Sequence, residues 1–322
     1  MRNLLINNAV TLFVVVIVLL LIIPMSPFML DVMIIINIAV SMMILIISMN
    51  IKEPLEFSIF PSLLLITTLF RLGINVSSTR NILSNSGQAG QVIKSFGTFV
   101  LQGNVVVGFV IFFIIVLVQF IVITKGAERV AEVAARFTLD AMPGKQMAID
   151  ADLSSGLINE AQAKQRREKI QREADFYGAM DGATKIVKGD AIMSIIITLI
   201  NLIGGSVIGM LGGGMAFTEV LSIYSIATVG DGLVSQIPAL LISTATGMIV
   251  TRAVSQGSLN DDVSGQFLAQ PRAIMFAGIV LAVLILIPGM PKLQLAILAI
   301  VLILAGLKLQ KKVSEAAEKA RI

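Results

Sequence analysis

The sequence of 322 residues contains neither cysteine nor histidine. Without cysteine the chain forms no disulfide and offers zinc no thiolate ligand, and without histidine it has no imidazole for a catalytic triad. The pair Gly144-Lys145 is followed by Gln146 and lacks the earlier glycine that a P-loop requires. We therefore expect that the protein is not an enzyme and uses no cofactor, and that any work it does draws on something other than its own ATP hydrolysis.

Charge is also scarce, and hydrophobic residues take its place. Charged residues make up 14% of the chain, whereas about 25% is usual for a soluble domain, and hydrophobic residues make up 56%. Apolar runs of about 17–25 residues recur, each long enough to cross a bilayer as a helix. The first run, from Leu4 to Ile23, has no small-residue cleavage site and is interpreted as a retained helix. The pattern predicts an all-α, polytopic integral membrane protein.

About eight transmembrane helices are predicted, with a soluble segment between the fourth and the fifth. The predicted spans are residues 5–23, 28–49, 58–80, 104–124, 191–211, 229–250, 273–288 and 291–308. The domains are then the first four helices in 1–124, a small cytoplasmic domain in 125–190, the last four helices in 191–308, and in 309–322 the start of a linker to a C-terminal cytosolic domain. The segment 125–190 is too long for an ordinary helix connection, so it is expected to fold on its own.

The distribution of basic residues predicts the orientation in the membrane. With both termini in the cytoplasm, lysine and arginine gather on the cytoplasmic side, as the positive-inside rule requires. The exceptions are Arg71, Arg80 and Lys94, which lie in an acid-free stretch placed in the membrane or beyond it. Either these charges are buried, or residues 71–103 form a re-entrant arrangement covered by neighbouring protein.

Polar residues inside the apolar spans are the candidates for function, because a charge at the bilayer centre costs at least about 2.5 kcal/mol. Helical spacing places them in stripes. The stripes consist of Thr67, Arg71, Asn75 and Ser78 in the third span, Asp190, Ser194, Thr198 and Asn201 in the fifth, and Asp231, Ser235, Ser243 and Thr246 in the sixth. Such stripes fit hydrogen bonding between packed helices, and their carboxylates also fit a proton or sodium path.

Asp190 has a second interpretation from its position. It stands at the predicted start of the fifth span, where the helix dipole favours a carboxylate, and Lys185 and Lys188 precede it as candidate partners. On spacing alone, a helix cap and a relay group are equally well supported.

Three long segments carry a specific resemblance to a known family. They are RLGINVSSTRNIL at 71–83, MPGKQMAIDADL at 142–153 and EADFYGAMDGATKIVKGDAI at 173–192. These segments, and nearly all of the chain, resemble the FHIPEP family of flagellar, hypersensitive-response and invasion protein export proteins. The resemblance implies a membrane component of a type III export gate, assembled as a nonameric ring, which couples proton-motive force to the export of unfolded proteins.

The resemblance also implies sites and partners. The matching charged positions are Arg80, Arg129, Arg136, Asp140, Lys185, Asp190 and Asp231. Asp190 is the first candidate for coupling, and Arg136 is expected to pair with Asp140 one turn later. Expected partners are further copies of the chain, other membrane components of the gate, exported proteins and membrane lipids, but no nucleic acid. Docking of export chaperones is expected only of the C-terminal cytosolic domain, which is absent here.

Two other functions stay open beside the export gate. An ion-coupled secondary transporter or cation channel would also need intramembrane Asp and Arg without a nucleotide site. A passive assembly scaffold would tolerate neutralisation of Asp190. The sequence leaves the flagellar and injectisome branches undecided.

Overall fold

The structure is a computed structural model that describes residues 9–101, 104–213, 216–252, 259–287 and 290–319. In these residues every regular element is helical, which confirms the predicted all-α fold. The chain divides into two compact units, residues 1–254 and 255–322, which are described separately.

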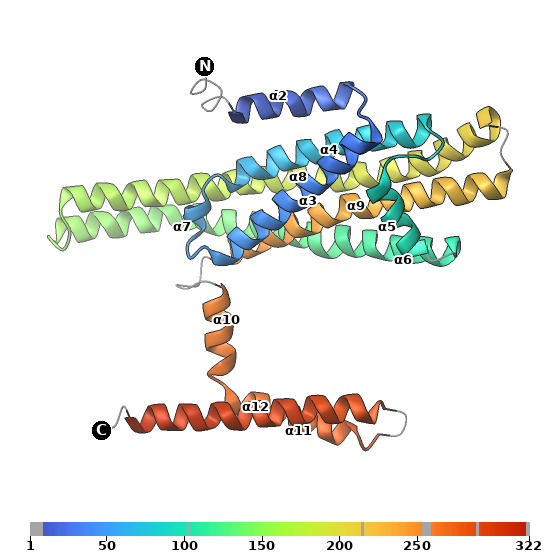
Figure 1. The fold of residues 1–322 in the computed structure, drawn as a ribbon. Helices are drawn as coiled ribbons and strands as arrows, with labels where there is room; N and C mark the ends of the chain where they lie inside the picture. Colours follow the sequence, from blue (N-terminus) through green and yellow to red (C-terminus); the bar gives the residue numbers. More distant parts are fainter. Residues whose placement is uncertain (1–8, 102–103, 214–215, 253–258, 288–289, 320–322) are drawn as a thin grey trace. The chain divides into compact units, whose positions relative to one another are not determined.

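The first unit begins with α2 (Ala9–Ile22), α3 (Pro27–Asn50), the short 3-10 helix η1 (Pro54–Phe57) and α4 (Phe60–Ser84), followed by α5 (Gln91–Leu101) and α6 (Val105–Leu117) (Figure 1). Polar residues fix where two of these helices begin. The Ser26 hydroxyl accepts a hydrogen bond from the Met29 N–H, ahead of Pro27 at the first helical position. The Asn104 side chain accepts from the Val106 and Val107 N–H groups in the same way.

The fourth predicted span continues without a break into the soluble segment. After α6, the π-helix η2 (Val118–Thr124) leads directly into α7 (Lys125–Ser154). A turn then leads to α8 (Glu160–Gly213), whose start is fixed by Asn159 and Gln162, since each side chain accepts a hydrogen bond from the other's backbone N–H. The expected folded element at 125–190 is therefore a hairpin made of α7 and the first half of α8.

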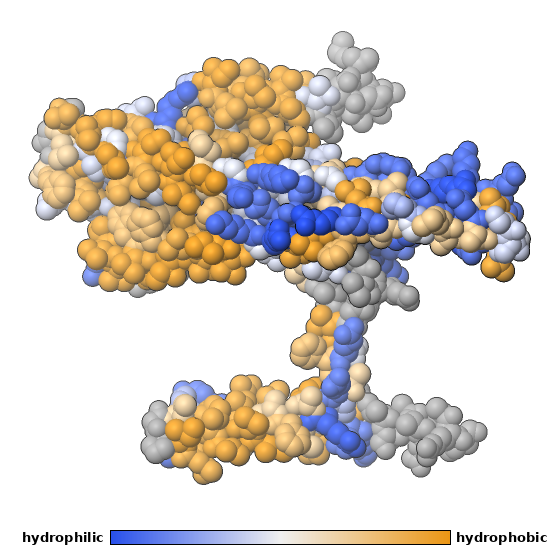
Figure 2. Space-filling view, turned by 180° about the vertical axis from the view of Figure 1, so that it is seen from behind, coloured by the Kyte–Doolittle hydropathy of each residue, from blue (hydrophilic) through white to orange (hydrophobic). Residues whose placement is uncertain are grey.

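The helix α8 is far longer than a bilayer is thick. Its 54 residues rise about 80 Å, against a hydrocarbon core of about 30 Å. Figure 2 shows hydrophilic residues along the hairpin and into the middle of the first unit, and a mainly hydrophobic surface over the part of this unit farthest from the hairpin end. The second half of α8 is therefore the part that suits a bilayer.

The helix α9 (Phe217–Thr251) completes the first unit and starts twelve residues before the span predicted at 229–250. The predicted span was too short because the polar residues Thr218, Glu219 and Ser222 interrupt the apolar pattern in the first turns of the helix. The helix forms because its inner face, including Val220 and Tyr224, is buried.

The second unit contains α10 (Leu259–Leu268), α11 (Pro271–Leu284) and α12 (Lys292–Lys319). The helices α11 and α12 form an antiparallel pair in which Gly278 lies against Ala299 and Ile303, and Gly306 lies against Pro271 and Met275. Small residues at these crossings allow close approach of the two backbones.

Among the described residues, six helices are long and apolar enough to cross a membrane: Pro27–Asn50, Phe60–Ser84, Val105–Ser154, Glu160–Leu211, Phe217–Thr251 and Lys292–Lys311. The shorter apolar helices Thr11–Ile22 and Pro271–Leu284 coincide with two further predicted spans. The chain is thus a polytopic helical protein with six clear candidate spans, and the total of eight stays a prediction.

Three helices in the first unit lie together and carry the predicted polar stripes. Arg71 of α4 meets Asp190 of α8, and farther along Leu83 lies near Gly204, so these two helices run parallel. Tyr224 of α9 packs on Gly205 and the earlier residue Val220 packs on Gly209, so α9 runs antiparallel to α8. The polar faces of all three helices therefore meet inside the bundle.

Candidate functional site

The site begins with an ion pair that is almost completely buried. The guanidinium group of Arg71 in α4 contacts the carboxylate of Asp190 in α8, and the two side chains are only 3% and 2% exposed. Burial of a single charge at this depth would be very unfavourable, so each group supplies the counter-charge that the other requires. This pairing explains how Arg71 is accommodated in an apolar helix.

One turn farther along α4, the network reaches α9. The Ser235 hydroxyl donates a hydrogen bond of 2.7 Å to the Asn75 side-chain oxygen, and both residues are buried. This bond joins α4 to α9 at a level between the Arg71–Asp190 pair and Asp231.

The second acidic group, Asp231 of α9, lies at the far end of the network. Its carboxylate accepts a 3.1 Å hydrogen bond from the Asn201 side chain of α8. The Ser78 hydroxyl of α4 lies within reach of the same carboxylate and also donates to the Asn75 carbonyl at 2.9 Å. Asp231 is therefore held by polar groups from both neighbouring helices.

Several atoms of this network remain without a hydrogen-bond partner in the described part of the chain. They are Nη1 of Arg71, Oδ1 of Asp190, Nδ2 of Asn75 and Oδ1 of Asn201. Unsatisfied buried polar groups are rare in folded proteins and call for a functional explanation. From Arg71 to Ser78 the network extends about 10 Å along α4. It contains two carboxylates separated by groups that both donate and accept, which is an arrangement suited to moving a proton or a small cation.

The predicted stripe residues Arg71, Asn75, Asp190, Asn201 and Asp231 thus converge on one site. Ser194 is also buried in α8, one turn after Asp190. The capping interpretation of Asp190 is wrong, because α8 begins thirty residues earlier, at Glu160, and no helix end lies near the carboxylate. The long hydrophilic half of α8 hid this continuity, since the span was recognised only from its apolar half.

The lysines that precede Asp190 have other partners. Lys185 pairs with Asp181 at 2.8 Å on the surface of α8, and Lys188 pairs with Glu128 of α7 at 3.0 Å. Neither lysine pairs with Asp190 in the described structure. Nothing in the sequence singled out Glu128, because its partner Lys188 lies sixty residues away along the chain.

The other predicted charged positions lie outside the network. Arg80, near the C-terminal end of α4, donates a 2.9 Å hydrogen bond to the Ile22 carbonyl at the end of α2. Arg136 pairs with Glu132 at 3.4 Å instead of the predicted Asp140, since the preceding turn already offers a carboxylate. Arg129 contacts the same Glu132 at 2.7 Å. These groups and the exposed Asp140 occupy the surface of the hairpin.

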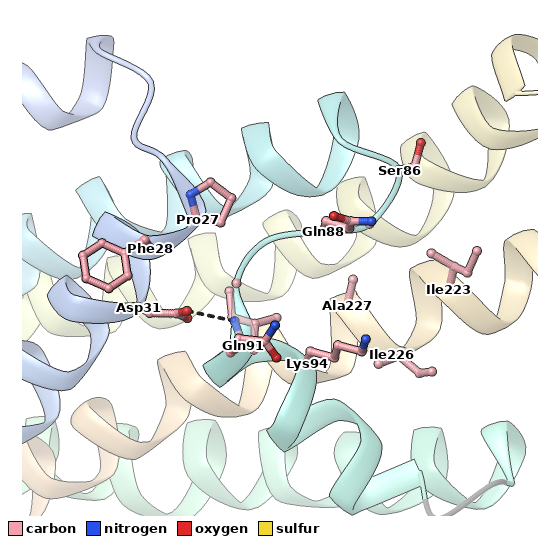
Figure 3. Close-up of a pocket in the computed structure, with 13 residues that line it drawn as sticks. Pro27, Phe28, Asp31, Ser86, Gln88, Gln91, Lys94, Ile223, Ile226 and Ala227 are labelled. Carbon is pink, nitrogen blue, oxygen red and sulfur yellow. Dashed lines mark hydrogen bonds between the residues drawn. The ribbon is translucent and has the colours of Figure 1, made fainter.

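A cavity of about 560 Å³ opens at the other end of the first unit, between the start of α3, residues 86–91, α5 and α9 (Figure 3). The Asp31 carboxylate accepts hydrogen bonds from the N–H groups of Gln91 and Val92, at 2.8 and 3.0 Å. Gly90 is required beside it, because its φ is +124° and a Cβ there would collide with Asp31. Asp31 therefore caps α5 and holds it on the bundle. Asp31 was not predicted as a site residue from the sequence. Its position shortly after Pro27, where a helix begins, was the one feature that could have indicated it.

The chain matches the FHIPEP family over residues 17–321, which is nearly its full length. The chain belongs to the FHIPEP family. It is 60% identical over 288 residues to the flagellar biosynthesis protein FlhA of Bacillus subtilis, covering 87% of this chain and 42% of that protein. It is 50% identical over 300 residues to the low calcium response locus protein D of Yersinia pestis, covering 92% of this chain and 42% of that protein.

A third relative is the putative flagellar export/assembly protein LfhA of Escherichia coli, 50% identical over 320 residues, which cover 98% of this chain and 46% of that protein. The FHIPEP chain thus spans less than half the length of the curated relatives it matches. No solved structure matches it. Two of the segments that carry the family resemblance, 71–83 and 173–192, supply the two halves of the Arg71–Asp190 pair.

Proposed function

We propose that this FHIPEP chain is the membrane part of a type III protein-export gate and that the Arg71–Asp190–Asp231 network couples proton-motive force to the export of unfolded proteins. The observation that carries the proposal is the buried ion pair. A salt bridge buried at membrane depth adds little net stability compared with apolar residues of the same size. Its presence therefore favours a functional role, because intramembrane ionisable groups commonly mark ion pathways.

The network has the properties that coupling needs. Protonation of Asp190 removes its attraction to Arg71 and leaves a buried guanidinium without a counter-charge. The three helices that contribute to the site would then relax, and α8 would transmit the change, since the same helix continues into the hairpin that bears Arg129, Arg136, Asp140 and Lys185 on its surface. One continuous helix thus connects the protonation site with a surface available to other proteins.

The gate is proposed to lie in the bacterial cytoplasmic membrane with both termini and the α7–α8 hairpin in the cytoplasm. It is further proposed to assemble as a nonameric ring with other membrane components of the gate. The energy source is a proton or sodium gradient, and the exported proteins are its substrates. The names of the relatives FlhA and LfhA refer to the flagellum and support a flagellar setting.

Export by cells that carry substitutions at Asp190 tests this proposal. In the full-length protein, we expect Asp190→Asn to reduce export by at least about tenfold, because asparagine keeps the shape but cannot bind and release a proton. Asp190→Glu should retain part of the activity. Export would be measured by secretion assay and swarming, with membrane abundance determined by immunoblot. Normal export with Asn at normal abundance would refute the coupling role and favour a passive scaffold.

The proposed orientation is tested by cysteine labelling. The chain has no cysteine of its own, so Ser86→Cys supplies a single thiol in the loop that follows α4. We expect a membrane-impermeant maleimide to label it from outside intact spheroplasts. Asp140→Cys on the hairpin is the matched control and should react only after the membrane is opened. Labelling of the Ser86 position from the cytoplasmic side alone would overturn the orientation.

A further inference from the structure

A groove of about 410 Å³ lies on the side of the first unit where α5, α6, η2 and α9 meet. Aliphatic and aromatic side chains form nearly all of its wall, among them Phe99, Val118, Leu233 and Leu240. The exceptions are Gln119 of η2 and Gln236 of α9, which line the groove from its two sides. Gln236 follows Ser235 along α9 but lines a different surface from the Arg71–Asp190 network.

Both glutamines are buried residues, and each has an amide group without a hydrogen-bond partner among the described residues. Gln119 is 3% exposed, and its Nε2 has no hydrogen-bond partner in the described structure. Gln236 is 8% exposed and makes no hydrogen bond with any described residue. An unsatisfied amide in a hydrocarbon environment costs several kcal/mol, so an isolated apolar groove should not contain two of them.

The backbone around Gln119 is also unusual. The chain leaves the α-helical path for one π-helical segment, Val118–Thr124, and resumes it at Lys125. Such segments are rare and occur often at functional sites. This segment contains Gln119, which lines the groove together with Gln236.

The depth of Gln119 decides what can satisfy the amides. Gln119 lies six residues before Lys125, or about 9 Å inward from that charged end of the span. At this depth the surroundings of a transmembrane helix are alkyl chains, which carry no hydrogen-bond acceptor. A lipid tail could fill the apolar part of the groove but would leave both amides unsatisfied.

A second copy of the chain is a poor occupant. In the described structure, the large exposed side chains recorded along the membrane halves of α3 and α8 are hydrophobic, for example Ile35, Met42, Ile46, Ile196 and Ile200. These large exposed side chains offer no hydroxyl or amide group to Gln119 or Gln236. The partner must therefore bring a polar group that these faces lack.

We infer that this groove binds a transmembrane helix of a different protein, which packs apolar side chains into the groove and presents one Ser, Thr, Asn or Gln to Gln119 and Gln236. Hydrogen bonds between such side chains are a recognised means of joining helices in a membrane. The site does not depend on the proposed export function, because it involves neither Asp190 nor Asp231.

The inference is tested with two synthetic membrane-spanning peptides in phosphatidylcholine vesicles that hold the intact chain. Both consist of leucine and alanine with lysine ends, and one carries a single Gln six residues from one end. Ile111→Cys, which is exposed on α6 outside the groove, carries a fluorescent donor, and the peptides carry the acceptor. We expect the Gln peptide to associate about three- to tenfold more tightly than the leucine peptide.

The groove is then changed to remove the amides. In the double variant Gln119→Leu with Gln236→Leu, the preference for the Gln peptide should fall to within about twofold, whereas Ser206→Ala, whose hydroxyl already bonds the Leu202 carbonyl, should leave it unchanged. Leucine removes unpaired polar atoms, so the double variant should fold, and circular dichroism verifies this. Equal binding of both peptides to the unchanged protein, or a preference that survives in the double variant, would overturn the inference. Retention of one phospholipid in native mass spectra, lost in the double variant, would assign the groove to lipid instead.

Discussion

Asp190→Asn in the isolated protein should lower the free energy of unfolding by about 3–5 kcal/mol, because it leaves the Arg71 guanidinium buried without a counter-charge. The partner variant Arg71→Met should cause a loss of similar size, since it leaves the buried Asp190 carboxylate without a counter-charge. Thermal unfolding in detergent, followed by the helical circular dichroism signal, measures both. Asp140→Asn is the control and should change stability by no more than about 0.5 kcal/mol, because Asp140 is exposed on the hairpin.

The double variant Arg71→Met with Asp190→Leu should recover most of this stability. Replacing a buried ion pair by apolar residues of similar volume is often neutral or stabilising, by up to about 4 kcal/mol. The two single losses and the double variant form a thermodynamic cycle with a large interaction energy. Additive losses, with the double variant the least stable of the three, would show that the two side chains do not act as a pair.

Gly230→Ala should destabilise the first unit by about 1–3 kcal/mol, because α5 and α9 approach each other too closely for another side-chain atom. A Cβ at Gly230 would overlap the Ile93 carbonyl and lie 3.1 Å from the Gly97 nitrogen, both on the backbone of α5. Backbone atoms cannot rotate away as a side chain can, so α5 has to shift. The loss should appear in thermal unfolding and as faster proteolysis at α5.

The matched control for this prediction lies in the same helix. Gly247 of α9 has nothing within 4 Å of the position where a Cβ would stand. Gly247→Ala should therefore be neutral or stabilising by up to about 1 kcal/mol, since alanine favours a helix more than glycine does. Equal effects of the two substitutions would mean that α5 does not pack against Gly230 as described.

Composition and periodicity predicted the all-helical membrane fold and the residues of the site. Charges inside apolar runs are costly wherever they occur, so Arg71, Asp190 and Asp231 stood out without any structure. Helical spacing then grouped Asn75 with Arg71 and Asn201 with Asp190. These predictions depend only on local geometry, which the sequence specifies directly.

The partners of these residues could not be predicted in the same way. Arg71 and Asp190 are 119 positions apart, and only the packing of α4 on α8 brings them together. Sequence reasoning searched for the partners of Asp190 within its own helix and so chose Lys185 and Lys188, which pair with Asp181 and Glu128. The choice of Asp140 for Arg136 failed for a different reason, because two carboxylates lie one turn away and spacing does not rank them.

The proposed coupling role is tested most directly by measuring export in cells whose full-length protein carries Arg71→Met together with Asp190→Leu. This variant should fold and reach the membrane, because neither charge of the buried pair is left without its partner, but it has no proton-binding group at the position of Asp190. We predict wild-type abundance in the membrane together with a loss of export of at least about tenfold. Export at the wild-type rate by this variant would show that the ion pair only holds the helices together and would contradict its role in coupling.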